Sequence, residues 1–323
     1  MTKASTIAAR PTTGRALPLF DREHTERVSE AQEKHATIWI PHGAAIAVQE
    51  RIEGMRLSTA GKRGTPLPGL RLSQASQAGK SRTLLQYRED LTRRMVASGT
   101  PVNPYQVLYV NLRIGVTLKM LCQQVLFQLG DPHWKSGNIE EITLRMEEFI
   151  RFRDVELLIV DEVQWLAKAR KDCEVVTDQL KNFLNDGIVP LVLAGNEESR
   201  ALFEMNTQLA SRLGVPLELS PLSTKEQAAA RAFKAFCAQL DAAIVDRSIF
   251  HRKSNFDDAA ILRGLMQASC GHVGRVCRIV EAALEHAIRR DAEFIEAYDL
   301  SYAVGHFAIP ADYCSTNPFE VAA

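Results

Sequence analysis

Apolar residues occur along this chain in two kinds of run, which alternate over most of its length. Short runs rich in β-branched and aromatic residues predict buried strands. The expected strands span residues 69–73, 106–112, 155–160, 189–194 and 215–219. Longer stretches with apolar residues at helical spacing predict helices over 82–98, 117–129, 139–153, 173–186 and 197–214. Because strands and helices alternate, we expect an α/β fold with a parallel sheet that helices cover on both faces.

The two ends of the chain differ from this alternation. Residues 1–35 are polar and of mixed charge, so we expect a flexible or partner-dependent arm that includes a helix over 23–34. A helix over 42–55 is expected before the first strand, and only helices are expected from residue 223 onward. The expected domains are an N-terminal arm (1–35), an α/β domain (36–222), a small all-helical domain (223–310) and a C-terminal tail (311–323).

Composition and charge narrow the class of protein. Hydrophobic residues make up 46% of the chain and charged residues 24%, as in ordinary soluble globular proteins. The 39 basic and 39 acidic residues balance, so a contact with DNA must come from a local patch rather than from net charge. The N-terminus lacks the apolar core of a signal peptide, and no apolar run reaches the ~18 residues of a membrane span. We therefore expect a cytoplasmic protein with no membrane partner.

The cysteines do not predict a metal site. Six of them are scattered through the chain, without C-x-x-C or another zinc spacing. Cys270 and Cys277 flank His272, but no second pair is present to complete four ligands. We interpret the cysteines as reduced, buried thiols, which is the usual state in the cytoplasm.

The first candidate for chemistry is the stretch QASQAGKS at residues 74–81, between an expected strand and an expected helix. Its end matches the phosphate-binding loop G-x-x-x-x-G-K-S/T, but Gln74 stands where that pattern begins with glycine. In such a loop, backbone N–H groups and the helix N-terminus face the β- and γ-phosphates. Lys80 would add a positive charge, and Ser81 would be a ligand of Mg²⁺.

Gln74 leaves two interpretations of this loop open. Glycine at the first position usually permits a turn that a side chain hinders, so glutamine fits only where φ is negative or strain is accepted. The alternative is a Gly-Lys-Ser surface turn that binds nothing. Residues expected to bind the nucleotide are Gln74, Ala75, Ser76, Gln77, Ala78, Gly79, Lys80, Ser81 and Arg82.

Two carboxylates follow the strongly apolar stretch LLIV, about 80 residues after the loop. Asp161 and Glu162 are expected at the carboxyl end of a buried strand, where ligands bind in open α/β sheets. Asp161 would hold Mg²⁺, directly or through water. Glu162 would polarise the water that attacks the γ-phosphate. The alternative is a solvated strand end without a ligand.

Three more polar residues stand at the ends of expected elements. Asn196 follows the next strand, where its amide would orient the attacking water or else cap a helix. Arg212 would reach the γ-phosphate of a neighbouring subunit as an arginine finger, with Arg200 as the second choice; a cation at a helix C-terminus is the alternative. Arg275, or else Arg278, would contact the γ-phosphate from the helical domain, unless it is a surface residue. Together these elements predict an ATPase that uses ATP and Mg²⁺.

The series resembles the AAA+ ATPases, and more narrowly the transposition regulators of the TniB/TnsC, MuB-like kind, over about residues 36–300. The segments that carry the resemblance are WIPHGAAIAVQERIEGM, SQASQAGKS, PYQVLYVNLRIGVTLKMLCQQVLFQLGDP, LLIVDEVQWL, LVLAGNEESRALFEMNTQLASRL and GHVGRVCRIVEAAL. The resemblance implies an AAA+ P-loop NTPase fold with a small all-α lid domain. It also implies the roles given above to Lys80, Ser81, Asp161, Glu162, Asn196, Arg212 and Arg275. Gln74 departs from the family's first glycine, which bears on affinity and hydrolysis rate more than on the fold.

The family resemblance further implies a set of partners. Such proteins assemble with ATP into rings or helical filaments on double-stranded DNA, recruit and stimulate a DDE-type transposase, and mark the insertion site. A TniQ-type targeting protein is a further candidate partner. Residues that would contact DNA phosphates are Arg113, Thr117 and Lys119 after the second strand, and Lys168, Arg170 and Lys171 after the third. The alternative for the second group is a solvated helix face.

Two other functions fit the same residues. Gln74 also suits a nucleotide-gated adaptor that binds ATP and hydrolyses it weakly. A helicase loader or a defence ATPase would share the same superfamily motifs. If the chain is a transposition regulator, we expect slow ATP hydrolysis that DNA or partner proteins stimulate.

Overall fold

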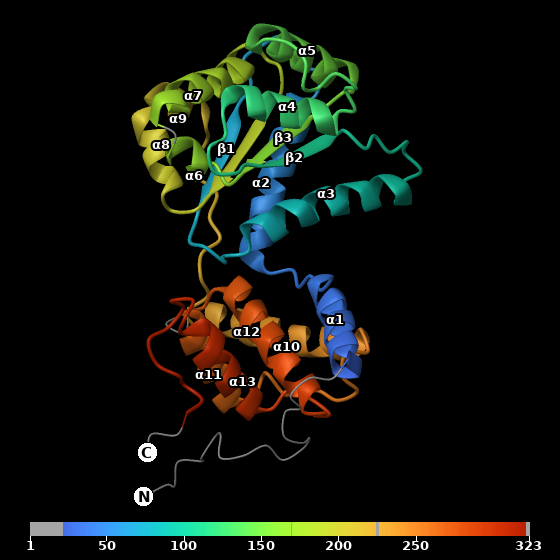
Figure 1. Cartoon of the computed structure of the whole chain (residues 1–323), viewed down its shortest axis with the longest axis vertical. Coiled ribbons are helices and arrows are strands. Elements are labelled where there is room, and N and C mark those ends of the chain that lie inside the picture. The colour runs from blue at the N-terminus through green and yellow to red at the C-terminus, as the bar shows by residue number, and fades with distance from the viewer. Residues whose placement is uncertain (1–21, 169, 224–225, 321–323) are drawn as a thin grey trace, which may run out of the picture. The chain divides into compact units, whose positions relative to one another are not determined.

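The structure, a computed structural model, describes residues 22–168, 170–223 and 226–320. Its residues form two compact units (Figure 1). One unit is residues 44–219. The other combines the described residues before 44 with those after 219, so the chain leaves the helical unit and later returns to it. Each unit has its own hydrophobic core.

A four-stranded parallel sheet forms the centre of the first unit, in the order β1-β4-β3-β2. Its strands are β1 (Gly69–Ser73), β2 (Val107–Asn111), β3 (Leu157–Asp161) and β4 (Leu191–Gly195). Every residue of β3 and β4 is buried, as expected for central strands of a parallel sheet. The register pairs Ser73 with Gly195 and Asn111 with Asp161, so the carboxyl ends of all four strands meet at one edge.

Helices flank this sheet and complete the expected α/β fold. They are α2 (Gly43–Thr59), α3 (Lys80–Ala97), α4 (Leu118–Gln128), α5 (Ile139–Phe152), α6 (Gln164–Lys168), α7 (Arg170–Asn185), α8 (Ser199–Met205) and α9 (Thr207–Arg212). Alternate residues of β3 and β4 share one core with the apolar faces of α4, α5 and α7. The sequence prediction of a parallel sheet with flanking helices is therefore confirmed.

The expected fifth strand at residues 215–219 is not a strand in the structure. The segment runs beside β1, because Gly214 N donates to Gly69 O at 2.9 Å and Leu217 N donates to Arg71 O at 2.8 Å. Pro216 stands between these two donors and has no N–H of its own. This segment therefore makes only separate hydrogen bonds to β1 and no continuous ladder. The prediction of a strand over residues 215–219 is wrong.

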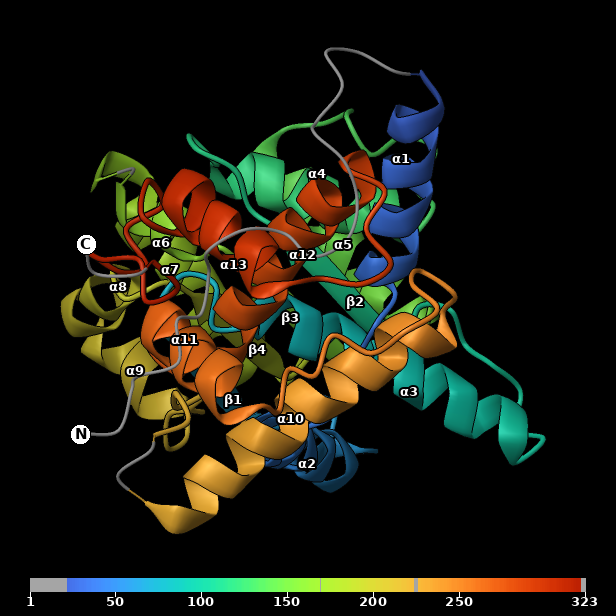
Figure 2. The ribbon, with the colours of Figure 1, turned by 90° about the horizontal axis from the view of Figure 1, so that it is seen from below.

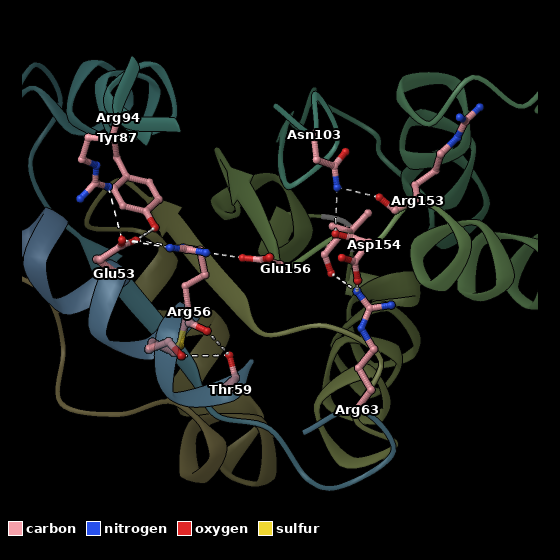
Figure 3. A network of polar contacts seen from close by, with 12 residues as sticks. Glu53, Arg56, Thr59, Arg63, Tyr87, Arg94, Asn103, Arg153, Asp154 and Glu156 are labelled. Atoms are coloured by element: carbon pink, nitrogen blue, oxygen red, sulfur yellow. Dashed lines mark hydrogen bonds and ion pairs between the residues drawn. The ribbon is translucent and has the colours of Figure 1, made fainter. Parts of the chain in front are cut away.

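A network of paired charges lies at the opposite, amino edge of the sheet (Figure 3). The buried Arg56 of α2 donates to both carboxylate oxygens of Glu53, at 2.9 and 3.0 Å, and to Glu156 just before β3. Tyr87 of α3 donates to Glu53 Oε2 at 2.6 Å. Arg94 lies 3.4 Å from the same carboxylate. These contacts join α2, α3 and the start of β3 and so fix the helices that precede and follow β1.

The second unit consists of helices, which Figure 2 shows from below. They are α1 (Arg22–Ala36), α10 (Gln227–Asp246), α11 (Ala259–Ser269), α12 (Val273–Arg289) and α13 (Ala297–Ala303), followed by a short π-helix over Val304–Ala308. The buried Arg290, just after α12, bonds Asp299 of α13 through two nitrogens, at 2.8 and 2.7 Å. A buried charge needs such pairing, so this contact ties α12 to α13.

Helix α1 confirms the helix expected over residues 23–34, and its packing corrects the expectation that residues 22–35 form a flexible arm. Its buried side chains include Val28, Ala31 and His35, which recur at helical spacing, and the helix packs on α12. His24 Nε2 and Arg27 Nη1 both bond Asp291 Oδ1, at 2.9 and 2.8 Å. The segment is mostly charged, which hid its narrow buried stripe from sequence reasoning. Residues 1–21 lie outside the described residues.

We predict that His35 makes the stability of this unit depend on pH. Burial lowers the pKa of His35 from 6.5 to about 4, and the charge of Arg278 acts in the same direction. Since the unfolded chain takes up the proton first, the stability from neutral His35 is complete above pH 6.5 and is lost as pH falls towards 4. We expect a loss of about 3 kcal/mol in the free energy of unfolding, and a smaller loss in His35→Leu. Urea unfolding at several pH values measures both; equal pH dependence in the two proteins would contradict the prediction.

Candidate nucleotide-binding site

The loop between β1 and α3 lies at the carboxyl edge of the sheet, where the sequence predicted a phosphate-binding loop. Its left-handed residues are Gln77, with φ of 62°, and Gly79, with φ of 90°. The φ angle of Gln74 is not positive. Glutamine fits at the first position because its φ angle is negative, so the left-handed conformation that favours glycine is not needed there.

Lys80 opens α3 and turns back into this loop. Its Nζ donates to Gln74 O at 2.9 Å and to Ala75 O at 2.8 Å. Burial lowers the pKa of Lys80, while the carboxylates of Asp161, Glu162 and others nearby raise it. An ammonium has three N–H donors, so Lys80 has one more for a phosphate oxygen. The loop thus holds a buried cation at the place where a triphosphate would lie.

Ser81 and Asp161 form the pair expected to hold magnesium. Ser81 Oγ donates to Asp161 Oδ2 at 2.6 Å, and Asp161 is fully buried. Its other oxygen, Oδ1, accepts from Glu162 N at 2.8 Å. A hydroxyl and a carboxylate oxygen in contact are the hard oxygen donors that Mg²⁺ prefers, so the residues present fit this ion.

Tyr109 of β2 is a member of the site that sequence reasoning missed. Its Oη donates to Asp161 Oδ2 at 2.5 Å, the same oxygen that Ser81 contacts. Burial and the Asp161 carboxylate raise the pKa of Tyr109, so the phenol keeps its proton and remains a donor. The sequence showed Tyr109 only as an aromatic residue in an apolar strand; its contact with Asp161 depends on the pairing of β2 with β3.

Glu162 and Asn196 stand at the ends of the central strands. Glu162 adopts a left-handed backbone, with φ of 62°. The side chain of Asn196 accepts from Glu198 N at 3.0 Å through Oδ1, as a turn cap, while its Nδ2 has no partner among the described residues. The two interpretations of Asn196 are therefore compatible, because one atom caps the turn and the other can donate to water.

The candidate arginines lie in different parts of the structure. Arg212 ends α9 and is exposed, as is Arg200 in α8. Arg275 belongs to the helical unit, where its guanidinium lies 4.9 Å from the ring centre of Tyr313 and its buried Nε has no acceptor among the residues that the structure describes. Arg278 instead pairs with Glu281 at 2.6 Å. The roles of these arginines towards a nucleotide stay predictions.

The candidate DNA-binding residues divide into three cases. Arg113 is exposed after β2. Thr117 caps α4 by accepting from Met120 N at 3.3 Å, and Lys119 donates to Gly137 O at 3.0 Å, so both have structural contacts. The side chains of Lys168, Arg170 and Lys171 lie outside the part of the chain that the structure describes.

The described cysteines differ in their exposure to solvent. Among the described residues, no group of three or more His, Cys, Asp or Glu side chains is arranged to hold a metal ion. Cys122 and Cys237 are buried, whereas Cys270 is exposed, so the expectation of buried thiols is wrong for Cys270. The Cys270 thiol donates to Tyr313 O at 3.4 Å, and the residue has the left-handed backbone that ends α11. In the described parts of the chain, no helix has the length and apolar character needed to cross a membrane.

The chain is similar in sequence to one protein family and in fold to several solved structures. A family model described as Bacterial TniB protein matches residues 30–223, which is more than half of the chain. No curated protein matches it. The Cdc6p structure from Pyrobaculum aerophilum has a TM-score of 0.61 at 15% identity, over 84% of this chain and 70% of that one. The Aeropyrum pernix ORC1 protein in complex with DNA has a TM-score of 0.56 at 18% identity, over 85% and 68%. At such identities the likeness concerns the fold, and it confirms the expected AAA+ architecture.

Proposed function

Because the chain belongs to the TniB family and has an AAA+ fold, we propose that it is an ATP-dependent regulator of DNA transposition. In this proposal it binds ATP with Mg²⁺ and hydrolyses it slowly to ADP and phosphate. It forms rings or helical filaments on double-stranded DNA, selects the target site, and recruits and activates a DDE-type transposase, with a TniQ-type protein as a further partner. The observation that carries the proposal is the convergence of Lys80, Ser81 and Asp161 at one edge of the sheet.

The proposed chemistry divides among the residues of that edge. The loop N–H groups and Lys80 bind the β- and γ-phosphates. Magnesium, when bound by Ser81 and Asp161, would offset phosphate charge. Glu162 takes a proton from the attacking water, and Asn196 Nδ2 donates to that water and orients it. Tyr109 holds the Asp161 carboxylate in place through its hydrogen bond.

In this proposal, assembly brings an arginine of one copy to the nucleotide bound by a neighbouring copy. Arg212 is exposed at the end of α9, a position suited to a cation that acts on the γ-phosphate of a neighbouring copy. Arg275 would act from the helical domain (223–310), which we propose as the lid of the α/β domain (36–222). The C-terminal tail (311–323) is given no role. These assignments use the domain boundaries that the sequence predicted.

Binding to DNA would depend on repetition rather than on a strongly basic surface. The chain has no net charge, so each subunit brings few cations to a duplex. An assembly repeats those few contacts along the phosphate backbone, which raises the overall affinity. Among the candidates, Arg113 is exposed just after β2. Phosphate contacts of this kind tolerate any sequence and weaken with salt.

The alternatives have less support than they had from sequence. The adaptor with weak hydrolysis was suggested by Gln74, and the backbone at that residue does not require glycine. A helicase loader or defence ATPase shares the superfamily fold, but the matching family model is that of TniB proteins.

The proposed function predicts nucleotide-dependent assembly on duplex DNA. With a non-hydrolysable ATP analogue and Mg²⁺, electron microscopy is expected to show regular rings or filaments on DNA, and with ADP they are expected to be rare. Raising the salt from ~50 to ~200 mM should weaken DNA binding at least ~10-fold, because phosphate contacts release counterions. ATP turnover should rise when duplex DNA is added. Absence of assemblies together with turnover that ignores DNA would favour the adaptor.

A further inference from the structure

Gln164, the first residue of α6, uses both ends of its side-chain amide within the candidate site. Its Nε2 donates to Glu162 Oε2 at 2.5 Å. Its Oε1 accepts from Asn196 N at 3.2 Å. The side chain therefore connects the end of β3, which carries the general base, to the end of β4, which carries the water-orienting amide.

These two contacts fix which way the amide points. The Asn196 backbone N–H can only donate, so the oxygen of the amide must face it. The NH₂ group must then face Glu162, whose ionised carboxylate can only accept. Gln164 is 3% exposed, so water does not compete for either contact. A buried amide with both ends satisfied has one orientation, and it holds its neighbours at a fixed spacing.

Gly195 provides the room that Gln164 needs. A β-carbon at residue 195 would lie 2.8 Å from Gln164 Oε1 and 2.8 Å from Ser199 Cβ. Such distances are too short for atoms that are not bonded to each other. The backbone φ of Gly195 is not positive, so space and not conformation requires glycine here. The strand end is thus built around the amide of Gln164.

We infer that Gln164 is a positioning residue for ATP hydrolysis, which sets the Glu162 carboxylate against Asn196. The inference rests on the proposed ATPase function. Glu162 has a left-handed backbone and a flexible side chain, and its carboxylate would otherwise sample several rotamers. Holding a general base in one place beside the water it activates accelerates the reaction without strengthening substrate binding. Gln164 does not contact the phosphates in this role; it acts through Glu162.

The test compares ATP turnover and ATP binding in Gln164→Met, which keeps the length of the side chain and removes both contacts. We expect kcat to fall about 10- to 100-fold, since a small misplacement of a catalytic group has that effect. The affinity for a fluorescent ATP analogue should stay within about 2-fold, because ground-state binding is unchanged. Gln86→Met is the matched control: Gln86 is also a buried glutamine, but it bonds Asp90 within α3. It should turn over like the unaltered chain.

Two further variants separate positioning from a general loss of structure. Gln164→Glu keeps an acceptor for Asn196 N and removes the donor to Glu162, so we expect lowered kcat with retained ATP affinity. In a Glu162→Gln background, Gln164→Met should cause no further loss, because a residue that acts through Glu162 has nothing left to position.

The possible outcomes keep this inference apart from the proposed function. Turnover in Gln164→Met equal to that of Gln86→Met, loss of ATP binding in step with turnover, or losses that add in the double variant would each overturn the role of Gln164. The ATPase function would stand in those cases, because turnover of the unaltered chain decides it. If the unaltered chain showed no turnover, both the ATPase function and the inference would fall.

Discussion

Lys80→Ala is expected to lower the affinity for ATP at least ~100-fold, which corresponds to about 2.7 kcal/mol. Lys80 is buried, and its ammonium lies inside the loop on the carbonyls of Gln74 and Ala75. Removing one partner of a desolvated charge pair costs 2–5 kcal/mol in well-studied interfaces, so the loss should be large. Titration of the protein with a fluorescent ATP analogue in the presence of Mg²⁺ measures it.

A matched variant shows whether the loss of ATP binding is specific to Lys80 or follows from removing any paired lysine of this unit. Lys181→Ala also removes a lysine from the same unit, where Lys181 pairs with Asp178 at 2.9 Å on α7. Its affinity for ATP should equal that of the unaltered chain. If Lys80→Ala retained micromolar affinity, the loop would not be the nucleotide site, and the proposed function would lose its central observation.

Glu162→Gln is expected to lower ATP turnover by about 10²- to 10⁴-fold while ATP binding persists, because general-base catalysis contributes that much. Glutamine keeps the length of the side chain and removes the carboxylate that accepts the proton. ATP should then remain bound, and assemblies on DNA should lengthen. Turnover is measured by phosphate release, and assembly length by electron microscopy.

Glu197→Gln is the sharper control for this experiment. Glu197 also follows β4 and lies near enough to Lys80 to raise the pKa of that ammonium. The substitution therefore removes a charge close to the loop without removing the proposed base. We expect turnover within a few-fold of the unaltered chain. Equal losses in the two variants, or shorter assemblies with intact turnover in Glu162→Gln, would contradict the role given to Glu162.

The sequence predicted the sheet and the order of the site elements because those depend on local patterns. Buried strands in a parallel sheet are short apolar runs, and polar residues directly after them meet at one edge. This places Ser81 and Asp161 in contact although 80 positions separate them. Gln74 could be judged only with the backbone in hand, since its φ angle is not a property of the local sequence.

The misses share one physical cause, which is a dependence on tertiary contacts. Tyr109 and Gln164 join the site through strand pairing and through a turn, and neither residue type marks chemistry by itself. The helix over residues 23–34 was expected, but its packing was not, because only contact with α12 buries the narrow apolar stripe of α1. The missing fifth strand is the exception, because its cause is local: Pro216 lacks the N–H that a strand ladder needs.

At Glu162, the left-handed backbone favours a different residue type than the proposed reaction does. Protein stability favours glycine, asparagine or aspartate, whereas the proposed general base must be glutamate. Such a conformation costs an ordinary residue about 1 kcal/mol, whereas glycine, asparagine and aspartate adopt it more easily. In a lineage that had lost the need to hydrolyse ATP, drift towards a more stable protein would replace this glutamate early. The proposed role of Glu162 as the general base would account for a glutamate at this costly position.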